Sequence, residues 1–253
     1  MGQRLEGKVA VITGASRGIG EAIAMHMGRE GAKVVLVSRK IEGLEAVAAK
    51  VREAGGDATP IACHVGKEDA RRQMLAEAIE AYGQVDILVN NAATNPHFGP
   101  MMTIDWGAWD KTFEVNVKGY FGMIKLLVNH LQERKAKGSI VNVASVAGQM
   151  AAPFQGTYAM TKAAVISMTR TLAMELGGAG IRVNAIAPGL IETKFAQALV
   201  ANDTFRAMVV ERAAAGRVGQ PEDIAGAAVF LGSDESDYVT GEVMVIDGGW
   251  TIG

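Results

Sequence analysis

The sequence predicts a single α/β domain built on a doubly wound parallel sheet of seven strands, spanning residues 1–253. Three observations predict this class. Short apolar runs alternate with helix-length amphipathic stretches along the whole chain. The first apolar run leads directly into a turn with three glycines. No proline- or serine-rich linker, charge block or low-complexity tract divides the 253 residues, so one domain is expected although the length alone would allow two.

The expected elements follow from the periodicity of apolar residues. Strands are expected at residues 8–13, 33–38, 58–63, 86–89, 139–144, 181–187 and 243–246. Helices are expected at residues 18–29, 42–54, 68–82, 106–135, 157–177 and 221–232. Sheets of this kind bind ligands beyond the carboxyl ends of their strands, where the strand order switches. The polar motifs of the chain follow predicted strands or lie on the next helix, so we expect them to converge there.

The glycine turn follows the first predicted strand in the segment LEGKVAVITGASRGIG, residues 5–20. Gly14 allows a sharp turn, and Gly18 and Gly20 allow close approach of a phosphate and of the following helix. The helix N-terminus offers N–H donors and a positive dipole to a pyrophosphate. The turn therefore predicts a Rossmann-like dinucleotide site. Its spacing is G-x3-G-x-G and not the more common G-x-G-x-x-G, which leaves tight packing of strand on helix as the alternative.

Tyr158 and Lys162 lie four residues apart in the segment YAMTK of a predicted helix, and Ser145 follows an apolar run thirteen residues upstream of Tyr158. A spacing of four places phenol and ammonium on one helix face. A free phenol titrates near pH 10, so a tyrosine that acts as acid or base near neutrality needs a cation beside it. The pair therefore predicts a tyrosine that acts as acid or base with the help of a lysine, although Tyr and Lys also meet by chance on exposed helices.

The second predicted strand ends at Ser38 and Arg39, where NAD-dependent proteins commonly place an acidic residue for the ribose hydroxyl. Arg39 and Arg17 of the glycine turn can instead bind the extra phosphate of NADP. The pattern favours NADP(H) over NAD(H). The alternative is that both arginines are solvated at the rim of the sheet.

Several motifs occur together in the order typical of one family: TGASRGIG, NNAA at 90–93, Asn116, Ser145, the YxxxK motif and PG at 188–189. The chain resembles the short-chain dehydrogenase/reductases over essentially its whole length. Within that family it is similar to 3-oxoacyl-carrier-protein reductases and sugar-acid dehydrogenases. It also resembles peroxisomal-type carbonyl reductases in CHVGK, DILVNNAATNPHFG and APGLIET.

The resemblance implies hydride transfer between NADP(H) and a carbonyl or secondary alcohol. It implies that Ser145 hydrogen-bonds the reacting oxygen, that Tyr158 is the acid or base, and that Lys162 bonds the nicotinamide ribose. Asn116 would anchor a water that relays protons to Lys162. The cofactor contacts expected in this way are Gly14, Ser16, Arg17, Gly18, Ile19, Gly20, Ser38, Arg39, His64, Val65, Asn91, Tyr158, Lys162, Pro188, Gly189, Ile191 and Thr193.

Two of these positions depart from the usual pattern of the family. His64 stands where an acidic or amide residue usually precedes Val65, so its ring is expected either near the adenine or in an ordinary packing role. The last residue of the NNAA motif is Ala93 where glycine is common, which matters only if the backbone there needs a positive φ.

Residues 190–216 are rich in Ala, Met, Phe and Val without a clean period, and we expect them to form an apolar flap over the substrate. Met150, Phe154 and the segment 95–98 are expected at the same mouth, with His97 as a candidate substrate contact.

Three functional alternatives stay open. A free ketone, keto sugar acid or secondary alcohol is one substrate class, and a 3-oxoacyl carrier protein is the other. The basic residue that carrier-protein reductases use for docking is replaced by Ala179, although Arg134, Lys135 and Lys137 form a basic cluster nearby. The third alternative is a nucleotide-binding regulatory protein without turnover, which the complete set of four catalytic residues disfavours.

Composition excludes other classes of function. A net charge of −2 gives no electrostatic reason to bind nucleic acid or an anionic membrane. No apolar run reaches membrane-spanning length, no signal peptide is recognisable, no metal site is expected, and the single Cys63 fits a reducing compartment. We therefore expect a cytoplasmic enzyme. By the resemblance it is a homotetramer with twofold interfaces, formed by the helices at 106–135 and 157–177 and by the tail from residue 241, with a dimer as the alternative.

Overall fold

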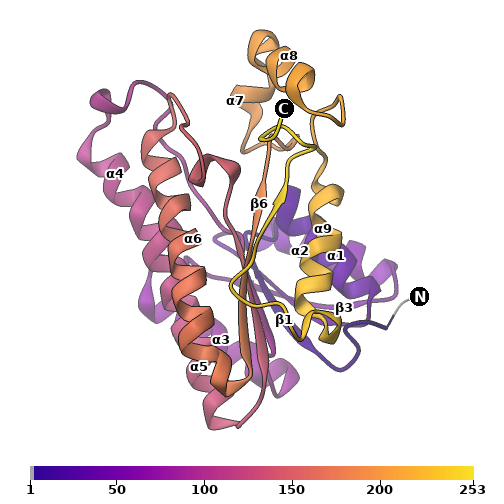
Figure 1. Cartoon of the computed structure of the whole chain (residues 1–253). Coiled ribbons are helices and arrows are strands. Elements are labelled where there is room, and N and C mark those ends of the chain that lie inside the picture. The colour runs from indigo at the N-terminus through magenta and orange to yellow at the C-terminus, as the bar shows by residue number, and fades with distance from the viewer. Residues whose placement is uncertain (1–2) are drawn as a thin grey trace.

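The computed structural model describes residues 3–253 and contains one seven-stranded, all-parallel sheet in the order β3-β2-β1-β4-β5-β6-β7 (Figure 1). The strands are β1 Val9–Thr13, β2 Lys33–Ser38, β3 Asp57–Ala62, β4 Ile87–Asn90, β5 Gly138–Val143, β6 Ile181–Pro188 and β7 Val243–Ile246. All seven predicted strands are confirmed within one or two residues. The single-domain Rossmann-like fold is confirmed with them.

The helices cover both faces of the sheet, with α1, α2 and α9 on one face and α3, α5 and α6 on the other (Figure 1). Their bounds are α1 Gly18–Arg29, α2 Ile41–Glu53, α3 Glu68–Tyr82, α4 Trp106–Phe113, α5 Tyr120–Glu133, α6 Gly156–Leu176, α7 Gln197–Val200, α8 Asp203–Arg212 and α9 Pro221–Gly232. None of the helices described is long and apolar enough to cross a membrane.

The pleat of the strands divides the core into two layers. In β1, Ala10 and Ile12 pack with α1, α2 and α9, while Val9 and Val11 pack with α3 and α5. Successive side chains of a strand point to opposite faces, so a strand covered on both sides is apolar throughout. This explains why all five residues of β1 are buried.

The strand order reverses at β1, which pairs with β2 on one side and with β4 on the other. Chain connections from β1 and β4 leave this point in opposite directions, which opens a crevice at the carboxyl ends of the strands. The same edge carries the ends of β5 and β6, with α7 and α8 above them (Figure 1). Every motif that the sequence analysis expected to converge lies at this edge.

Two parts of the helix prediction were wrong. The single helix expected at 106–135 is interrupted by a π-helical turn, Glu114–Gly119, between α4 and α5. The turn contains Asn116, whose buried side chain bonds the backbone of Thr94, and such turns commonly mark functional sites. In the flap region the structure has two helices, α7 and α8, where none was expected, and α8 is capped by the Asn202 side chain.

Candidate active site

A cleft of about 1120 Å³ lies at the carboxyl edge of the sheet. Of the predicted cofactor contacts and catalytic residues, all but Gly20 and Asn116 line it. Those lining it are Gly14, Ser16, Arg17, Gly18, Ile19, Ser38, Arg39, His64, Val65, Asn91, Ser145, Tyr158, Lys162, Pro188, Gly189, Ile191 and Thr193. The cleft therefore brings together predicted residues that are as far apart in the sequence as Gly14 and Thr193.

The glycine turn is shaped for close backbone approach. Gly14 and Gly18 have φ of 67° and 59°, in the left-handed region that favours glycine. A Cβ atom on Gly20 would clash with the Gly14 carbonyl oxygen and with Asn91 Nδ2. Gly20 thus packs α1 against the turn, behind the cleft, while Gly14 and Gly18 form its wall. Gly20 therefore has the packing role predicted for the glycines, whereas Gly14 and Gly18 lie where close approach to the backbone is possible.

The N-terminus of α1 opens into the cleft with its first N–H groups free of any side-chain cap. Its N-cap residue, Arg17, has extended backbone and makes no capping bond. Uncapped N–H groups at a helix N-terminus form a site for an anion. Asn91 holds the turn in place, because its Nδ2 donates to the carbonyl oxygens of Thr13 at 2.9 Å and Gly14 at 3.2 Å.

Arg17 and Arg39 both line the cleft, and neither forms an ion pair with a residue in 3–253. A pyrophosphate and an additional phosphate fit this set of donors: an uncapped helix terminus and two guanidinium groups. No group of three or more His, Cys, Asp or Glu side chains that could hold a metal ion lies within the described part of the chain.

His64 lines the cleft but is tied to its neighbours. Its Nδ1 accepts a hydrogen bond from Gly66 N at 3.1 Å, and its Nε2 lies 3.1 Å from Lys111 Nζ. Burial, and secondly the positive charge of Lys111, lower the pKa of His64. The imidazole is therefore neutral at pH 7, with Lys111 beside it. Lys111 itself lines the cleft and was not predicted, since nothing in the sequence places a residue of α4 against the end of β3.

The proposed catalytic side chains come from two elements that meet at the inner end of the cleft. Ser145 follows β5, and Tyr158 and Lys162 lie on the first two turns of α6. Burial raises the pKa of Tyr158 above its ordinary value, and the neighbouring Ser145 hydroxyl opposes this shift only in part. The expectation that the neighbouring cation lowers the phenol pKa is therefore not met by the chain's own groups, because burial is the larger effect.

Lys162 is almost completely buried, with 1% of its surface exposed. Its Nζ donates to the Val143 carbonyl oxygen at 2.6 Å and to Tyr120 Oη at 3.4 Å, and lies 5.5 Å from the centre of the Tyr158 ring. Burial lowers the pKa of Lys162 to about 7. An amine that titrates near neutrality beside a phenol is suited to proton transfer.

Asn116 lies behind the cleft and connects two of its walls. Its Oδ1 accepts from Thr94 N at 2.9 Å, and its Nδ2 donates to Thr94 O at 3.0 Å and to Thr161 Oγ1 at 3.1 Å. Thr161 in turn donates to the carbonyl oxygen of Tyr158 at 2.7 Å. Both N–H bonds of the amide are used within the protein, so the side chain positions the loop after β4 against α6. Its role toward a relay water stays a prediction.

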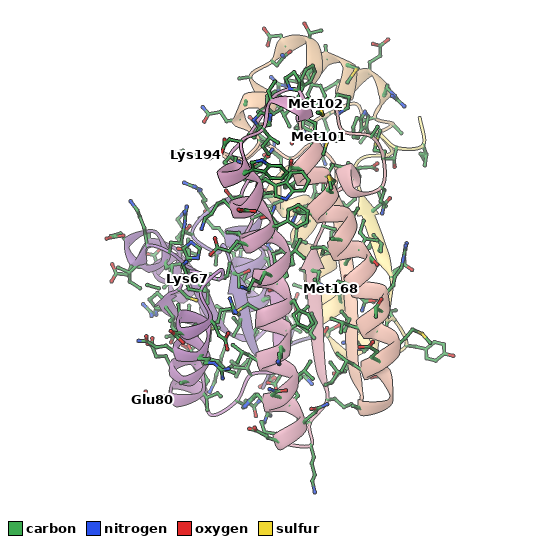
Figure 2. All side chains as sticks on the ribbon, turned by 90° about the vertical axis from the view of Figure 1, so that its left-hand side faces the viewer. Lys67, Glu80, Met101, Met102, Met168 and Lys194 are labelled. Atoms are coloured by element: carbon green, nitrogen blue, oxygen red, sulfur yellow. The ribbon has the colours of Figure 1, made fainter. Side chains whose placement is uncertain are left out.

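The outer half of the cleft is apolar and aromatic. Phe195 packs on Tyr158 with ring centres 5.7 Å apart, and Phe98 packs on Phe154 at 6.2 Å. Of the predicted mouth residues, Asn95, Phe98, Met150 and Phe154 line the cleft, together with Leu199, Phe205 and Met208 of the predicted flap and the unpredicted Trp250. Figure 2 shows Met101, Met102 and Lys194 at this same end of the molecule.

His97 does not line the cleft. Its Nε2 lies 3.2 Å from the Pro100 carbonyl oxygen of its own loop, and a substrate contact by this ring stays a prediction. The basic cluster considered for carrier docking lies near Ala179 as expected, since Gly138 N donates to Gly180 O at 3.3 Å. Arg134 bonds Asp86 at 3.2 Å at the amino edge of the sheet, the edge opposite the cleft.

Comparisons with known proteins agree with this geometry. The family model described as enoyl-(acyl carrier protein) reductase matches residues 14–251. The 3-oxoacyl-[acyl-carrier-protein] reductase FabG of Thermotoga maritima is 40% identical over 249 residues, covering 98% of this chain and 100% of that protein. Dehydrogenase/reductase SDR family member 4 of Homo sapiens is 40% identical over 245 residues, covering 97% of this chain and 88% of that protein.

Among solved structures, a gluconate 5-dehydrogenase from Burkholderia cenocepacia in complex with NADP and tartrate superimposes with a TM-score of 0.94. It is 34% identical and covers 99% of this chain and 97% of its own. The sheet order, the glycine turn, the Ser-Tyr-Lys cluster and these similarities lead to one conclusion. The chain belongs to the short-chain dehydrogenase/reductase family, whose members are oxidoreductases that act on CH–OH groups.

Proposed function

We propose that this protein transfers a hydride between NADP(H) and a ketone or secondary alcohol, with Tyr158 as the acid or base. The observation that carries the proposal is one continuous cleft with two chemically different ends. One end holds the glycine turn with Arg17 and Arg39, and the other holds Ser145, Tyr158 and Lys162. Binding of a dinucleotide along the cleft would bring its reactive ring to the catalytic end.

Each residue has a distinct role in this proposal. A reduced nicotinamide held in the cleft would supply the hydride. Ser145 donates a hydrogen bond to the carbonyl oxygen, where negative charge develops during reduction. Tyr158 supplies the proton to that oxygen, or removes it in the oxidation direction. Lys162 holds a positive charge beside the phenol and offers a donor to the ribose. Phe195, packed on Tyr158, shields the phenol from water.

NADP(H) is preferred in this proposal because Arg17 and Arg39 line the cleft without carboxylate partners in the described chain. An additional phosphate on the ribose would satisfy them. Replacing Arg39 by Asp tests this directly. We expect kcat/KM with NADPH to fall about tenfold to a hundredfold, since a bidentate pair is lost and a repulsion is added. Kinetics with both coenzymes measure the effect, and an unchanged preference would refute the assignment.

The substrate is proposed to be a free, largely apolar ketone or the matching alcohol. The outer cleft presents four phenylalanines, Phe98, Phe154, Phe195 and Phe205, while its amides Asn95 and Gln155 bond each other at 3.3 Å. Such a lining offers mainly apolar contact area, and the polar side chains of the flap that line it include Lys194, Asn202 and Arg212. The similarity to a 3-oxoacyl-carrier-protein reductase keeps the thioester as the second candidate.

A substrate panel separates these candidates. Apolar ketones, diketones, keto sugar acids and acetoacetyl thioesters are compared by kcat/KM, with loss of NADPH absorbance as the readout. The proposal expects apolar ketones to lead by at least about tenfold, the value of one or two buried methylene groups. A thioester bound to carrier protein that leads the panel would instead establish the second candidate.

Tyr158→Phe tests the proposed chemistry. The variant keeps the ring and its contact with Phe195 but loses the acidic proton. We expect turnover to fall by about 10²–10⁴-fold, the range typical of losing a general acid, with NADPH binding nearly unchanged. Coenzyme binding is followed by nicotinamide fluorescence. Retained turnover would refute the role, and NADPH binding without reduction of any carbonyl by the wild type would establish a nucleotide-binding regulatory protein.

We propose a homotetramer for the assembly and the cytoplasm for its location. Large apolar side chains are exposed on two separate faces: Trp106 and Phe121 on α4 and α5, and Tyr238 and Ile252 near the C-terminus. Two apolar faces on one chain fit two different twofold contacts. Light scattering after size exclusion distinguishes the tetramer from the dimer that a single face would give.

A further inference from the structure

Tyr120 touches the catalytic lysine from behind the cleft. It is the first residue of α5, follows the π-helical turn directly, and has 1% of its surface exposed. Its hydroxyl donates to the Val143 carbonyl oxygen at 3.2 Å and accepts from Lys162 Nζ at 3.4 Å. Because Lys162 also donates to Val143 O at 2.6 Å, the amine, the phenol oxygen and the carbonyl oxygen form a closed triangle.

The direction of these bonds is fixed by chemistry. An ammonium group has three N–H donors and no acceptor, so it can only donate to Tyr120 Oη. The phenol proton of Tyr120 points to Val143 O, which leaves its lone pairs for Lys162. Burial raises the pKa of Tyr120 well above its ordinary value, so this phenol stays neutral and keeps its proton. The two bonds leave one N–H of Lys162 for a group in the cleft.

The amine also lies between two aromatic rings. Its Nζ is 5.2 Å from the centre of the Tyr120 ring and 5.5 Å from that of Tyr158, both within the range of cation–π attraction. The titratable groups that face it are these two phenols, from α5 and α6, and within residues 3–253 no carboxylate contributes to its titration. The oxygen of Tyr120 is therefore one of two acceptors that stabilise the charged form of Lys162 in a buried site.

We propose that Tyr120 is a positioning residue, which holds the Lys162 amine in place and in its charged form without touching coenzyme or substrate. This proposal rests on the proposed function, because it assigns a partner to the lysine of the Tyr158 pair. Tyr120 does not line the cleft, and it acts only through Lys162. No local sequence pattern selects Tyr120, because its contact with α6 depends on the π-helical turn that precedes it.

Tyr120→Phe removes one oxygen atom and keeps the ring. The charged amine then loses an acceptor, so its proton affinity falls. Reduction requires the ammonium, and activity declines with rising pH as the ammonium loses its proton. We expect this alkaline decline of kcat to move down by about one pH unit, the scale of losing one hydrogen bond to a charged group. At a pH below the decline, kcat should stay within about threefold of the wild type.

Tyr82→Phe is the matched control. The Tyr82 hydroxyl also makes two bonds, to Thr59 at 2.9 Å and Asp57 at 2.8 Å, but it lies on α3 away from the cleft. This variant should reproduce the wild-type pH profile even if its stability falls. Circular dichroism and NADPH binding verify folding of both variants. Equal profiles for wild type, Tyr120→Phe and Tyr82→Phe would overturn the proposal.

A second measurement does not depend on activity. The 13Cε resonance of Lys162, assigned by its absence in Lys162→Met, reports the protonation of the amine directly. Its titration midpoint should be lower in Tyr120→Phe than in the wild type, and an unchanged midpoint overturns the proposal. Failure of the proposed function is recognised separately, because it would appear as retained turnover in Tyr158→Phe, whatever the titration of Lys162.

Discussion

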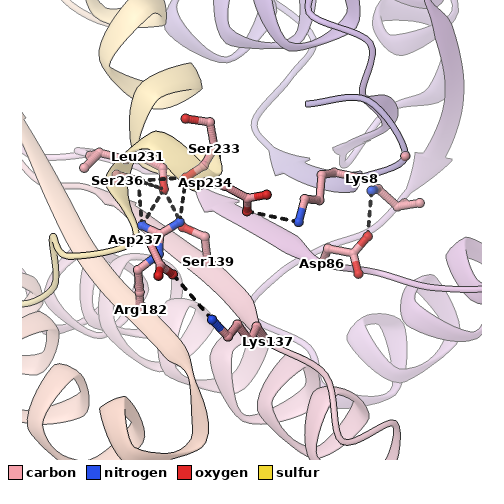
Figure 3. A network of polar contacts seen from close by, with 12 residues as sticks. Lys8, Asp86, Lys137, Ser139, Arg182, Leu231, Ser233, Asp234, Ser236 and Asp237 are labelled. Atoms are coloured by element: carbon pink, nitrogen blue, oxygen red, sulfur yellow. Dashed lines mark hydrogen bonds and ion pairs between the residues drawn. The ribbon is translucent and has the colours of Figure 1, made fainter. Parts of the chain in front are cut away.

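At the carboxyl edge of the sheet, the buried Lys162 has two oxygen acceptors and no carboxylate, whereas at the amino edge the Arg182 guanidinium makes three hydrogen bonds. Arg182 donates to Leu231 O at 2.9 Å, Ser236 Oγ at 2.7 Å and Ser233 O at 3.0 Å (Figure 3). These acceptors lie at the C-terminus of α9, where a cation complements the helix dipole. Arg182 therefore stabilises the end of a helix, whereas Lys162 lies in the cleft with one N–H group available to a ligand.

The titration of the two groups follows from these surroundings. Burial lowers the pKa of Lys162 to about 7, into the range where the amine gains and loses its proton. Burial also lowers the pKa of Arg182, with Asp237 and Asp234 opposing the shift, but a guanidinium stays charged in proteins. The comparison indicates that the amino edge is built for stability. The carboxyl edge keeps polar groups incompletely satisfied, which is unfavourable for folding and useful for chemistry.

Lys162→Met gives the largest expected effect. Methionine has a similar length and no charge, so we expect turnover to fall by about 10²–10⁴-fold because the charge beside Tyr158 is lost. The free energy of unfolding at pH 7 should stay equal or increase, since an unpaired buried amine is replaced by an apolar side chain. Steady-state kinetics and urea unfolding measure the two quantities. A loss of more than about 2 kcal/mol would show that Lys162 is a structural residue instead.

The pH dependence of the free energy of unfolding, compared between wild type and Lys162→Met, is a sharper test. Between pH 7 and 10.5 the unfolded chain keeps the Lys162 proton while the folded chain loses it, so the contribution of this group to stability rises with pH. Wild type should therefore gain stability relative to Lys162→Met, by at most about 1.4 kcal/mol per pH unit. Unfolding from pH 7 to 8.5 avoids Cys63, whose raised pKa of about 11 has the opposite sign above pH 9. A pH-independent difference would contradict the lowered pKa of Lys162.

Arg182→Met should show the reverse pattern. The carbonyl oxygens of Leu231 and Ser233 and the hydroxyl of Ser236 each lose the hydrogen bond from the guanidinium, and the C-terminus of α9 loses its cation. We expect the free energy of unfolding to fall by about 2–4 kcal/mol, with kcat and KM within about twofold of the wild type. Thermal unfolding and kinetics on one preparation test both parts. A large kinetic effect with unchanged stability would remove the distinction between the edges.

The sequence was sufficient to predict the features that depend on residues within a few positions of one another. The strands were placed correctly because β1, β4 and β5 are short, mostly apolar runs, a pattern typical of strands that are buried on both faces. The glycine turn and the spacing of Tyr158 and Lys162 are likewise local, and the structure brings them together with Ser145 in one cleft. These residues could be found without coordinates because each pattern has a physical reason within a few positions of the chain.

The remaining features depend on long-range contacts. The π-helical turn is fixed by Asn116 bonding Thr94 from 22 residues away, and Phe195 reaches Tyr158 from a segment whose composition has no period. Lys111 meets His64 only because α4 passes the end of β3. The pKa of Tyr158 was misjudged for the same reason, since the extent of burial is a property of the folded chain.

The smallest effect is expected for Lys137→Ala. Lys137 Nζ lies 3.7 Å from Asp237 Oδ1 at the amino edge, with 76% and 69% of the two side chains exposed (Figure 3). Exposed pairs of this kind contribute less than about 0.5 kcal/mol, so stability should barely change. Lys8→Ala, which breaks the Lys8–Asp234 pair at 3.2 Å on the same edge, is the matched control.

The same variant tests whether the amino edge takes part in function. A carrier protein that delivers a substrate to the cleft must dock near the carboxyl edge, because the reacting carbonyl has to reach Tyr158. Lys137→Ala should therefore leave the KM of a carrier-bound acetoacetyl thioester unchanged, as it leaves that of the free thioester. If the KM rises for the carrier-bound form alone, the basic cluster at the amino edge binds the carrier. In that case the separation of a stabilising edge from a functional edge would fail.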